Sequence, residues 1–308
     1  MTHLSVVIPV YNESSLIDEL LKRVKTNVKS ITEDYEIIIV DDGSQDNTWK
    51  LIEVEAEKEP RIKGIKFSRN FGHHYAITAG IHHSNSDWVV VMDGDLQDRP
   101  EVIPELYAKA LTGYDVVFVS RQNRPEKLYY RIAQKLFYWL LIALSGIKFD
   151  SRQANYSIIS KKVADAFKNF PENSRFYSST IKWLGFNASY ILADHGKRHS
   201  GKPSYNLKKR FKLASDIILS FSERPLKFAI GIGVLMSVLS FILAILIIYR
   251  SLKWGYEVEG WVSLISAIGL STGLTLLISG IIGIYIGQIF NQVKNRPLYV
   301  TEQKVNLL

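Results

Sequence analysis

Two long uncharged stretches near the C-terminus constrain this chain more than any other feature. No charged residue occurs at positions 228–249 or 260–293, and Ile, Leu, Val, Phe and Ala fill most of the first stretch. Each is longer than the roughly 20 residues that a helix needs to cross about 30 Å of hydrocarbon. A buried helix of a soluble protein is the alternative explanation for either stretch taken alone. Two such stretches together are better explained by membrane helices. We therefore expect two transmembrane helices, at about 228–249 and 262–287, joined as a hairpin by a short connector.

The distribution of charge predicts how this hairpin is oriented. The formal net charge is +8, and residues 195–227 contribute nine Lys and Arg against only Asp216 and Glu223. Basic residues recur after the second stretch at Lys294, Arg296 and Lys304. By the positive-inside rule both termini are cytoplasmic. The basic block directly precedes a membrane span, so its position favours a lipid surface and argues against nucleic acid.

A basic amphipathic helix is expected just before the first span. Leu207, Phe211, Ala214, Ile218 and Phe221 recur at helical spacing beside a cluster of Lys and Arg,. This pattern is typical of a helix that lies in the headgroup plane, and an ordinary surface helix is the alternative. The apolar segment 128–146 is expected to dock on the membrane or on a partner subunit. No signal peptide precedes the first strand pattern, so we expect a multi-pass protein of the inner (cytoplasmic) membrane whose N-terminal domain stays in the cytoplasm.

The first 200 or so residues alternate between strand and helix patterns. Short runs rich in β-branched residues predict strands at 4–10, 35–42, 62–68, 87–93 and 114–120,. The βαβα order predicts an α/β domain with a mostly parallel, Rossmann-like sheet. Ligands of such sheets bind at the carboxyl ends of the strands, where polar clusters follow four of the predicted strands. The sequence has no Gly-x-Gly-x-x-Gly motif and no Walker lysine loop, which argues against dinucleotide and P-loop sites.

An acidic segment after the fourth strand predicts a metal site. Asp93, Asp95 and Asp98 lie within six residues, beside Gln97. Solvated loop acids are the simple interpretation, but such crowded carboxylates suit a divalent cation that carries a phosphate-bearing substrate. Oxygen donors in a chain with no cysteine favour Mg²⁺ or Mn²⁺,. The pairs His73-His74 and His82-His83 lack the ligand spacing of a zinc site and are interpreted as helix-surface residues.

Together these motifs resemble a known family. The segments at 9–13 (PVYNE), 41–44 (DDGS), 69–72 (RNFG), 93–98 (DGDLQD) and 120–124 (SRQNR), with the C-terminal hairpin and VKNRPLYV, are similar to family 2 glycosyltransferases. Within that family, the motifs most resemble the polyisoprenyl-phosphate glycosyltransferases, such as dolichyl-phosphate mannose synthase, bactoprenol glucosyltransferase and undecaprenyl-phosphate aminoarabinose transferase. It implies a GT-A catalytic domain at 1–200, a basic interfacial helix at 201–227, two membrane helices within 228–293 and a cytoplasmic tail at 294–308.

The resemblance also implies a reaction and roles for individual residues. A sugar would move with inversion from a nucleotide-diphosphate sugar, a UDP-sugar first of all, to a polyprenyl phosphate such as undecaprenyl phosphate, giving a lipid-linked monosaccharide for modification of a cell-envelope glycan. A homo-oligomer, in some relatives a tetramer, is a further implication. The implied sets are metal ligands (Asp93, Asp95, Gln97), donor-nucleotide-binding residues (Pro9, Tyr11, Glu13, Asp42, Ser44, Asp93), catalytic residues (Asp95, Arg121, Arg131, Arg198) and acceptor-phosphate-binding residues (Arg198, Lys202).

Departures from the family pattern keep two other function classes open. Asn155-Tyr156-Ser157 stands where relatives often carry Asp-Phe-Arg or Gly-Phe-Arg, so a carboxylate proposed as a base in some of them is absent. This change keeps a catalytically inactive scaffold under consideration. A processive membrane polysaccharide synthase is the other alternative, although the sequence lacks the Gln-x-x-Arg-Trp motif and the additional spans typical of that class.

Overall fold

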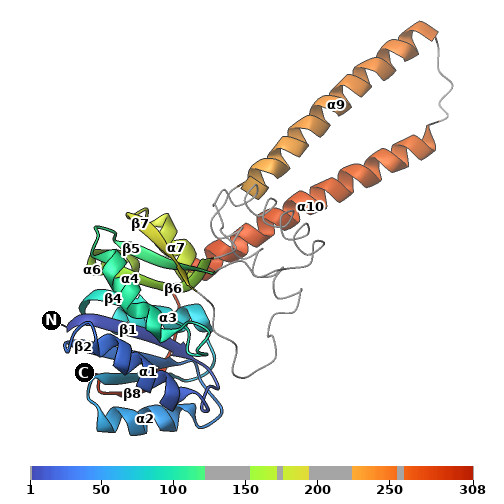
Figure 1. The fold of residues 1–308 in the computed structure, drawn as a ribbon. Coiled ribbons are helices and arrows are strands. Elements are labelled where there is room, and N and C mark those ends of the chain that lie inside the picture. Colours follow the sequence, from blue (N-terminus) through green and yellow to red (C-terminus); the bar gives the residue numbers. More distant parts are fainter. Residues whose placement is uncertain (1, 122–152, 172–175, 194–223, 255–259, 308) are drawn as a thin grey trace, which may run out of the picture. The chain divides into compact units, whose positions relative to one another are not determined.

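The computed structural model describes residues 2–121, 153–171, 176–193, 224–254 and 260–307. The chain forms two compact units. The first comprises residues 1–126, 150–204 and 296–308, and the second comprises 127–149 and 205–295. The C-terminal residues therefore belong to the same unit as the N-terminal domain, although the hairpin separates them in the sequence (Figure 1).

The first unit is built on one mixed sheet with the strand order β7-β5-β6-β4-β1-β2-β3-β8. Its strands are β1 (Thr2–Val10), β2 (Tyr35–Asp41), β3 (Ile62–Phe67), β4 (Ser86–Val91), β5 (Val116–Arg121), β6 (Gln153–Ser160), β7 (Ala188–Ala193) and β8 (Thr301–Val305). β1 pairs in parallel with β2 and β4, β2 with β3, and β5 with β7. The pairs β4–β6, β5–β6 and β3–β8 are antiparallel.

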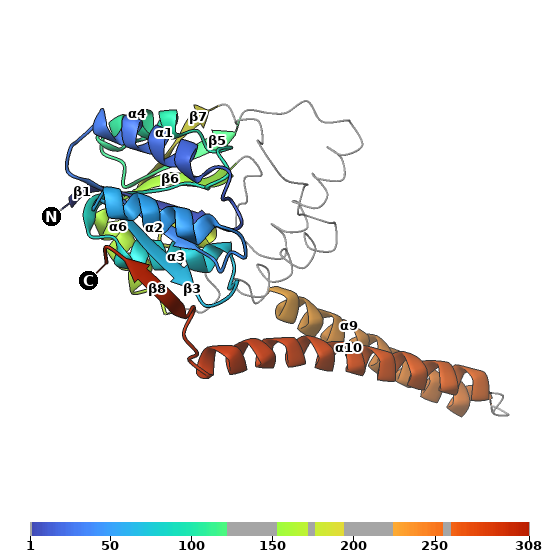
Figure 2. The ribbon, with the colours of Figure 1, turned by 90° about the horizontal axis from the view of Figure 1, so that it is seen from below.

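Helices cover both faces of this sheet (Figure 2). α1 (Ile17–Lys29), α2 (Thr48–Lys58) and α4 (Ile103–Ala110), which follows the short 3-10 turn η1 (Pro100–Val102), pack on one face. α3 (His73–His83), α6 (Lys161–Lys168) and α7 (Tyr177–Trp183) pack on the other. Side chains of β1 alternate between the two cores, with Val6 and Ile8 on one face and Val7 on the other. A sheet buried on both faces explains why the central parallel strands β1, β2 and β4 contain continuous apolar runs,.

The five strands predicted from the sequence are present within two residues of their expected bounds. The α/β prediction is confirmed, and the sheet is more mixed than the βαβα pattern alone indicates. β6, β7 and β8 were not predicted from the sequence, and the residues of β8 were expected to belong to a C-terminal tail.

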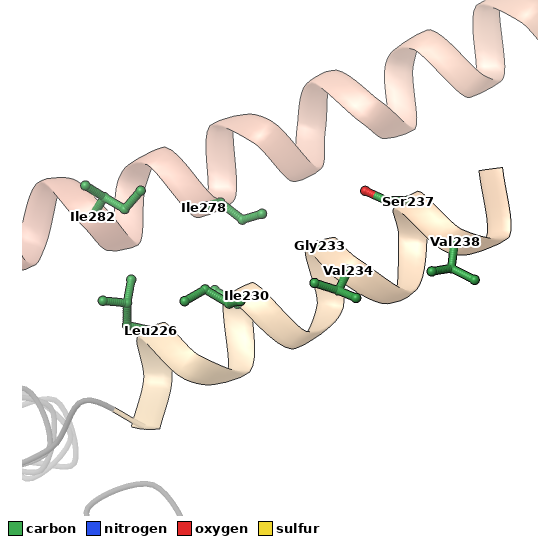
Figure 3. Close-up of a pocket in the computed structure, with 9 residues that line it drawn as sticks. Leu226, Ile230, Gly233, Val234, Ser237, Val238, Ile278 and Ile282 are labelled. Carbon is green, nitrogen blue, oxygen red and sulfur yellow. The ribbon is translucent and has the colours of Figure 1, made fainter. Parts of the chain in front are cut away.

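The second unit contains two long helices, α9 (Arg224–Trp254) and α10 (Trp261–Val293), which include both predicted spans. Both are long and apolar enough to cross a membrane. Large apolar side chains such as Phe241 and Leu276 are exposed along them, as expected of helices that face lipid,. An apolar cavity of about 500 Å³ lies between the helices. Figure 3 shows Leu226 and Ile230 of α9 on the side of α9 that faces Ile278 and Ile282 of α10. The predicted segments 128–146 and 207–221 lie outside the described residues.

Candidate functional site

Four polar loops lie together on one edge of the sheet. β4, β1, β2 and β3 are adjacent and mutually parallel, so their carboxyl ends share this edge. The loops that follow them carry Tyr11, Ser44, Phe71 and Asp93. The sequence predicted that these four loops share one edge, from the βαβα alternation and from the polar clusters that follow the strands.

The loops after β1 and β2 are tied together by side-chain hydrogen bonds. The Asn12 amide donates to Ser44 Oγ at 2.9 Å, and the Gln45 amide donates to Asn12 Oδ1 at 2.8 Å. The Glu13 amide donates to Thr48 Oγ1 at 2.9 Å. Ser44 Oγ in turn donates to Asp41 Oδ1. Ser44 and Glu13, both predicted to bind the donor, therefore also help to fix the loop that would carry it.

Asp46 has a structural role in this same pair of loops. Its carboxylate accepts from the amides of Ser14, at 3.1 Å, and Thr48, at 3.0 Å. Burial by itself would raise the pKa of Asp46, but hydrogen bonds from Thr48 and Ser14 outweigh it, and the net pKa is lowered. The hydrogen bond from Thr48 satisfies a backbone amide at the first residue of α2, so Asp46 helps to stabilise the start of this helix,.

Asp42 connects the loop after β2 to the loop after β3. Its carboxylate accepts from the amides of Phe71, at 2.7 Å, and Gly72, at 2.9 Å to Oδ2. Only 3% of Asp42 is exposed, and burial raises its pKa against the lowering effect of these two amides. Gly43 has φ of +72°, and a Cβ there would lie 2.4 Å from the carbonyl carbon of Arg69. The two loops are therefore in direct backbone contact, and only glycine fits at position 43.

The acidic loop after β4 has alternating burial. Gly94, Leu96 and Asp98 are buried, whereas the three predicted metal ligands Asp93, Asp95 and Gln97 are partly exposed. The Asp93 amide donates to Asp98 Oδ2 at 3.1 Å, so the buried carboxylate braces the turn. Asp95 accepts from the backbone amide and side-chain amide of Gln97, at 3.0 and 2.7 Å.

Glycine at position 94 lets this loop lie directly against β1. A Cβ on Gly94 would stand 2.6 Å from Val10 Cγ1 and 3.2 Å from the Pro9 carbonyl oxygen. The missing side chain brings the loop against Pro9, one of the predicted donor-binding residues. Pro9 is buried, and the neighbouring Tyr11 is 42% exposed at the same edge.

His73 joins the site at the first turn of α3. Its Nε2 lies 3.2 Å from Asp93 Oδ1 and 3.3 Å from Asn155 Nδ2. Burial alone would lower the pKa of His73, but the charges of Asp93, Asp42 and Asp98 outweigh it and the net pKa is raised. The sequence predicted His73 to be a helix-surface residue. Its side chain is 41% exposed, and the remainder packs against the site, where Nε2 contacts Asp93 and Asn155. Sequence spacing gave no signal of these two contacts.

Most of the basic residues predicted to bind phosphate lie outside the residues that the structure describes. Arg121 is the last residue of β5, and the structure describes its backbone only. Arg131, Arg198 and Lys202 lie outside the described residues. Their roles remain predictions.

The donor set of the acidic loop fits a hard divalent cation. Asp93, Asp95 and Gln97 supply carboxylate and carbonyl oxygens, the ligands that Mg²⁺ and Mn²⁺ prefer. Within the described ranges no three His, Cys, Asp or Glu side chains form a preformed metal cluster. A Mg²⁺ that is held by one or two carboxylates and completes its shell with substrate phosphates needs no such cluster. The residues present therefore suit a cation that arrives with a phosphorylated substrate.

Comparison with known proteins identifies the family. The model of the family described as glycosyl transferase family 2 matches residues 5–178, which is more than half of the chain. The chain is 37% identical over 304 residues to the uncharacterized glycosyltransferase YkcC of Bacillus subtilis, covering 98% of this chain and 94% of that protein. It is 36% identical to the uncharacterized glycosyltransferase sll0501 of Synechocystis, covering 96% and 94% of the two chains.

Among solved structures, the chain is similar to glucosyl-3-phosphoglycerate synthase from Mycobacterium tuberculosis in complex with Mn²⁺, UDP and phosphoglyceric acid. The TM-score is 0.49 with 19% sequence identity, covering 71% of this chain and 76% of that one. The family match and the close relatives in sequence agree with the α/β sheet and the polar edge described above. The chain belongs to glycosyl transferase family 2 and is a glycosyltransferase with a GT-A fold.

Proposed function

We propose that this protein is an inverting membrane glycosyltransferase that moves a sugar from a nucleotide-diphosphate sugar, with a UDP-sugar as the first candidate, to a polyprenyl phosphate such as undecaprenyl phosphate. One observation carries the proposal. An oxygen-rich acidic loop suited to a metal diphosphate belongs to the same folded unit as chain segments that precede and follow an apolar helical hairpin, residues 150–204 and 296–308.

The geometry of the acidic loop supports a nucleotide-diphosphate donor. Asp93, Asp95 and Gln97 are partly exposed in this loop and would hold Mg²⁺ or Mn²⁺,. Such a cation supplies Lewis-acid neutralisation of the charge on a departing diphosphate. Pro9, Tyr11 and the loops tied by Ser44 and Asp42 border the same edge and would receive the nucleoside.

The chemistry requires no strong base from the protein. A phosphate oxygen of the acceptor attacks the anomeric carbon while the bond from that carbon to the diphosphate oxygen breaks, which inverts the configuration. The acceptor phosphate is already ionised near neutral pH, so no proton must be removed from the nucleophile. A neutral residue at position 155 is compatible with this reaction. The protein must instead supply positive charge, and Arg121, Arg131, Arg198 and Lys202 are the candidates.

The hairpin supports a lipid-borne acceptor and a membrane location. α9 and α10 expose apolar side chains along their length, and β8 after the hairpin pairs with β3 before it. If the helices span the bilayer, both flanks lie on one side, and the positive-inside rule makes that side the cytoplasm. The basic segment 201–227 would then rest on the lipid surface and present the catalytic domain to the acceptor phosphate. Assembly into a homo-oligomer is a further part of the proposal.

Transfer into lipid tests this proposal directly. Membranes that contain the protein, undecaprenyl phosphate and a panel of radiolabelled sugar nucleotides should yield an organic-extractable product with one of the donors. Asp95→Asn should lower turnover on the order of 100-fold or more, because charge stabilisation at the leaving group is lost. EDTA should do the same to the wild type, and Mn²⁺ or Mg²⁺ should restore it.

The control variant is Asp87→Asn, which changes an acid near the start of β4, at the opposite end of the strand from the acidic loop. Long polymer as the product would identify a processive synthase, and no product with any donor would point to an inactive scaffold. Undiminished transfer by wild type in EDTA would exclude the metal from the reaction.

A further inference from the structure

The C-terminal segment 299–306 closes the edge of the catalytic sheet beside the site. β8 adds to β3 in antiparallel register, with Gly64 opposite Val305 and Phe67 opposite Thr301. Asn306 ends the strand by donating its side-chain amide to the carbonyls of Ala56, at 2.7 Å, and Ile62, at 2.9 Å. These contacts join a segment beyond the hairpin to β3, which lies more than 230 residues earlier in the chain (Figure 2).

Residues at positions 64 and 305 are matched in size. A Cβ on Gly64 would lie 2.7 Å from Val305 Cγ1, and Ile52 and Trp49 occupy the remaining space. Lys66 of β3 also forms an ion pair with Glu302 at 3.1 Å on the strand surface. The pairing is thus set by packing as well as by backbone hydrogen bonds, so β8 is an integral strand of the sheet.

The segment also supports the loop after β3. The ring of Tyr299 stacks on Phe67, with centroids 4.8 Å apart and ring planes 16° apart. Phe67 contacts Phe71 edge-on at 5.7 Å, and the Ser68 amide donates to the Val300 carbonyl at 3.0 Å. The loop that receives these contacts supplies the two amides that bind the buried carboxylate of Asp42.

We propose that residues 299–306 are a positioning element of the donor pocket, in which Tyr299 orders the 68–72 loop and through it the Asp42 loop. The inference rests on the proposed function, because it takes the Asp42 loop to receive the nucleoside. Tyr299 acts through Phe67 and Phe71, so it is a positioning residue. Residues 299–306 follow α10 closely in the sequence, so the strand that supports the donor pocket is covalently connected to the hairpin.

The test compares Tyr299→Ala with the full-length wild type in nanodiscs. We expect Tyr299→Ala to weaken binding of UDP, titrated calorimetrically with Mg²⁺, by about three- to tenfold, the range of a lost aromatic pair. Hydrogen exchange at the Phe71 and Gly72 amides should accelerate in the same variant. In transfer assays the KM for donor should rise while kcat at saturating donor is retained.

Two variants separate positioning from general stability. Tyr299→Phe keeps the stacked ring and should restore wild-type UDP affinity. Glu302→Gln removes the Lys66 ion pair from the same segment without touching Phe67, and it should leave UDP affinity and exchange at Phe71 unchanged. If Tyr299→Ala fails to fold, Tyr299→Leu, which keeps apolar volume but no ring face, takes its place in both measurements.

Where the wild type binds UDP, faster exchange at Phe71 and Gly72 together with weaker UDP binding supports the inference, and any other combination overturns it. Wild-type protein that binds no UDP would count against the proposed donor. Exchange at the two amides would then still decide whether Tyr299 orders the loop, so the two failures are distinguishable.

Discussion

At the scale of single residues, the acidic loop shows how much its glycine contributes. Gly94 leaves the main chain of the loop in contact with Pro9 and Val10, with no space for a methyl group. Its neighbours Asp93 and Asp95 belong to a turn in which the Asp93 amide is held by the Asp98 carboxylate. The positions of the candidate ligands therefore depend on Gly94, which has no side chain to bind a ligand.

Gly94→Ala should therefore damage metal binding without removing any ligand. The added Cβ overlaps Val10 Cγ1, and such overpacking costs about 1–3 kcal/mol of stability. We expect a lower thermal midpoint and weaker Mn²⁺ binding in the presence of UDP, measured by electron paramagnetic resonance. Asp87→Asn, near the start of β4, serves as the control with normal Mn²⁺ binding. Wild-type stability and Mn²⁺ affinity in Gly94→Ala would show that the loop tolerates displacement from β1.

The assignment of Asp93, Asp95 and Gln97 as metal ligands stays a prediction. The structure shows that these three residues are partly exposed between the buried residues Gly94, Leu96 and Asp98. Contacts between His73, Asn155 and Asp93 depend on three separate elements, and no spacing rule encodes them. Asp42 illustrates a third case, because the sequence suggested a ligand-binding acid and the structure shows that its carboxylate also holds the 71–72 amides.

At the scale of elements, strands with two buried faces were predicted and strands at the edge were not. β1 to β5 are runs of β-branched residues because helices cover both faces of the sheet. β8 reads TEQKV and is mostly exposed, so its sequence carries no strand signal, and its partner β3 lies far away in the chain. β6 is antiparallel within an otherwise βαβα order, which a rule of alternation does not anticipate.

Contact between α3 and α7 predicts a dependence of stability on pH. The Tyr177 amide, at the start of α7, lies 3.4 Å from His74 Nδ1 on α3, which accepts its hydrogen bond only when that nitrogen carries no proton. Burial, together with the charge of His73, lowers the pKa of His74 to about 3, against an unfolded value near 6.5,. The unfolded chain therefore binds a proton in this range that the folded chain does not, so stability rises with pH.

The stabilising effect of neutral His74 should be complete above about pH 6.5 and lost progressively as the pH falls toward 3,. Replacement with a group that does not titrate, His74→Gln, should flatten the fall in the denaturation midpoint over this range. His82→Gln, at the exposed end of the same helix, should leave the slope unchanged. Identical slopes for His74→Gln and wild type would show that other groups cause the acid sensitivity.

At the scale of the whole molecule, β8 makes the topology of the hairpin testable. The same sheet contains strands from before α9 and after α10, so spanning helices would force both flanks into one compartment. The sequence predicted that arrangement from Lys and Arg alone, whereas strand pairing supports it independently of charge. The chain contains no cysteine, so single introduced thiols report without background.

When intact cells are treated with an impermeant maleimide, one of three introduced cysteines should therefore be labelled and the other two protected. Tyr256→Cys, in the connector between the apolar stretches, should be labelled from outside. Asn47→Cys and Gln303→Cys, exposed on the loop after β2 and on β8, should be labelled only after the cells are permeabilised. Labelling of all three from outside would place the catalytic domain on the outer side. Labelling of Tyr256→Cys and Gln303→Cys without Asn47→Cys would mean that α10 ends outside, where β8 has no access to β3, and the C-terminal support of the donor pocket would be lost with it.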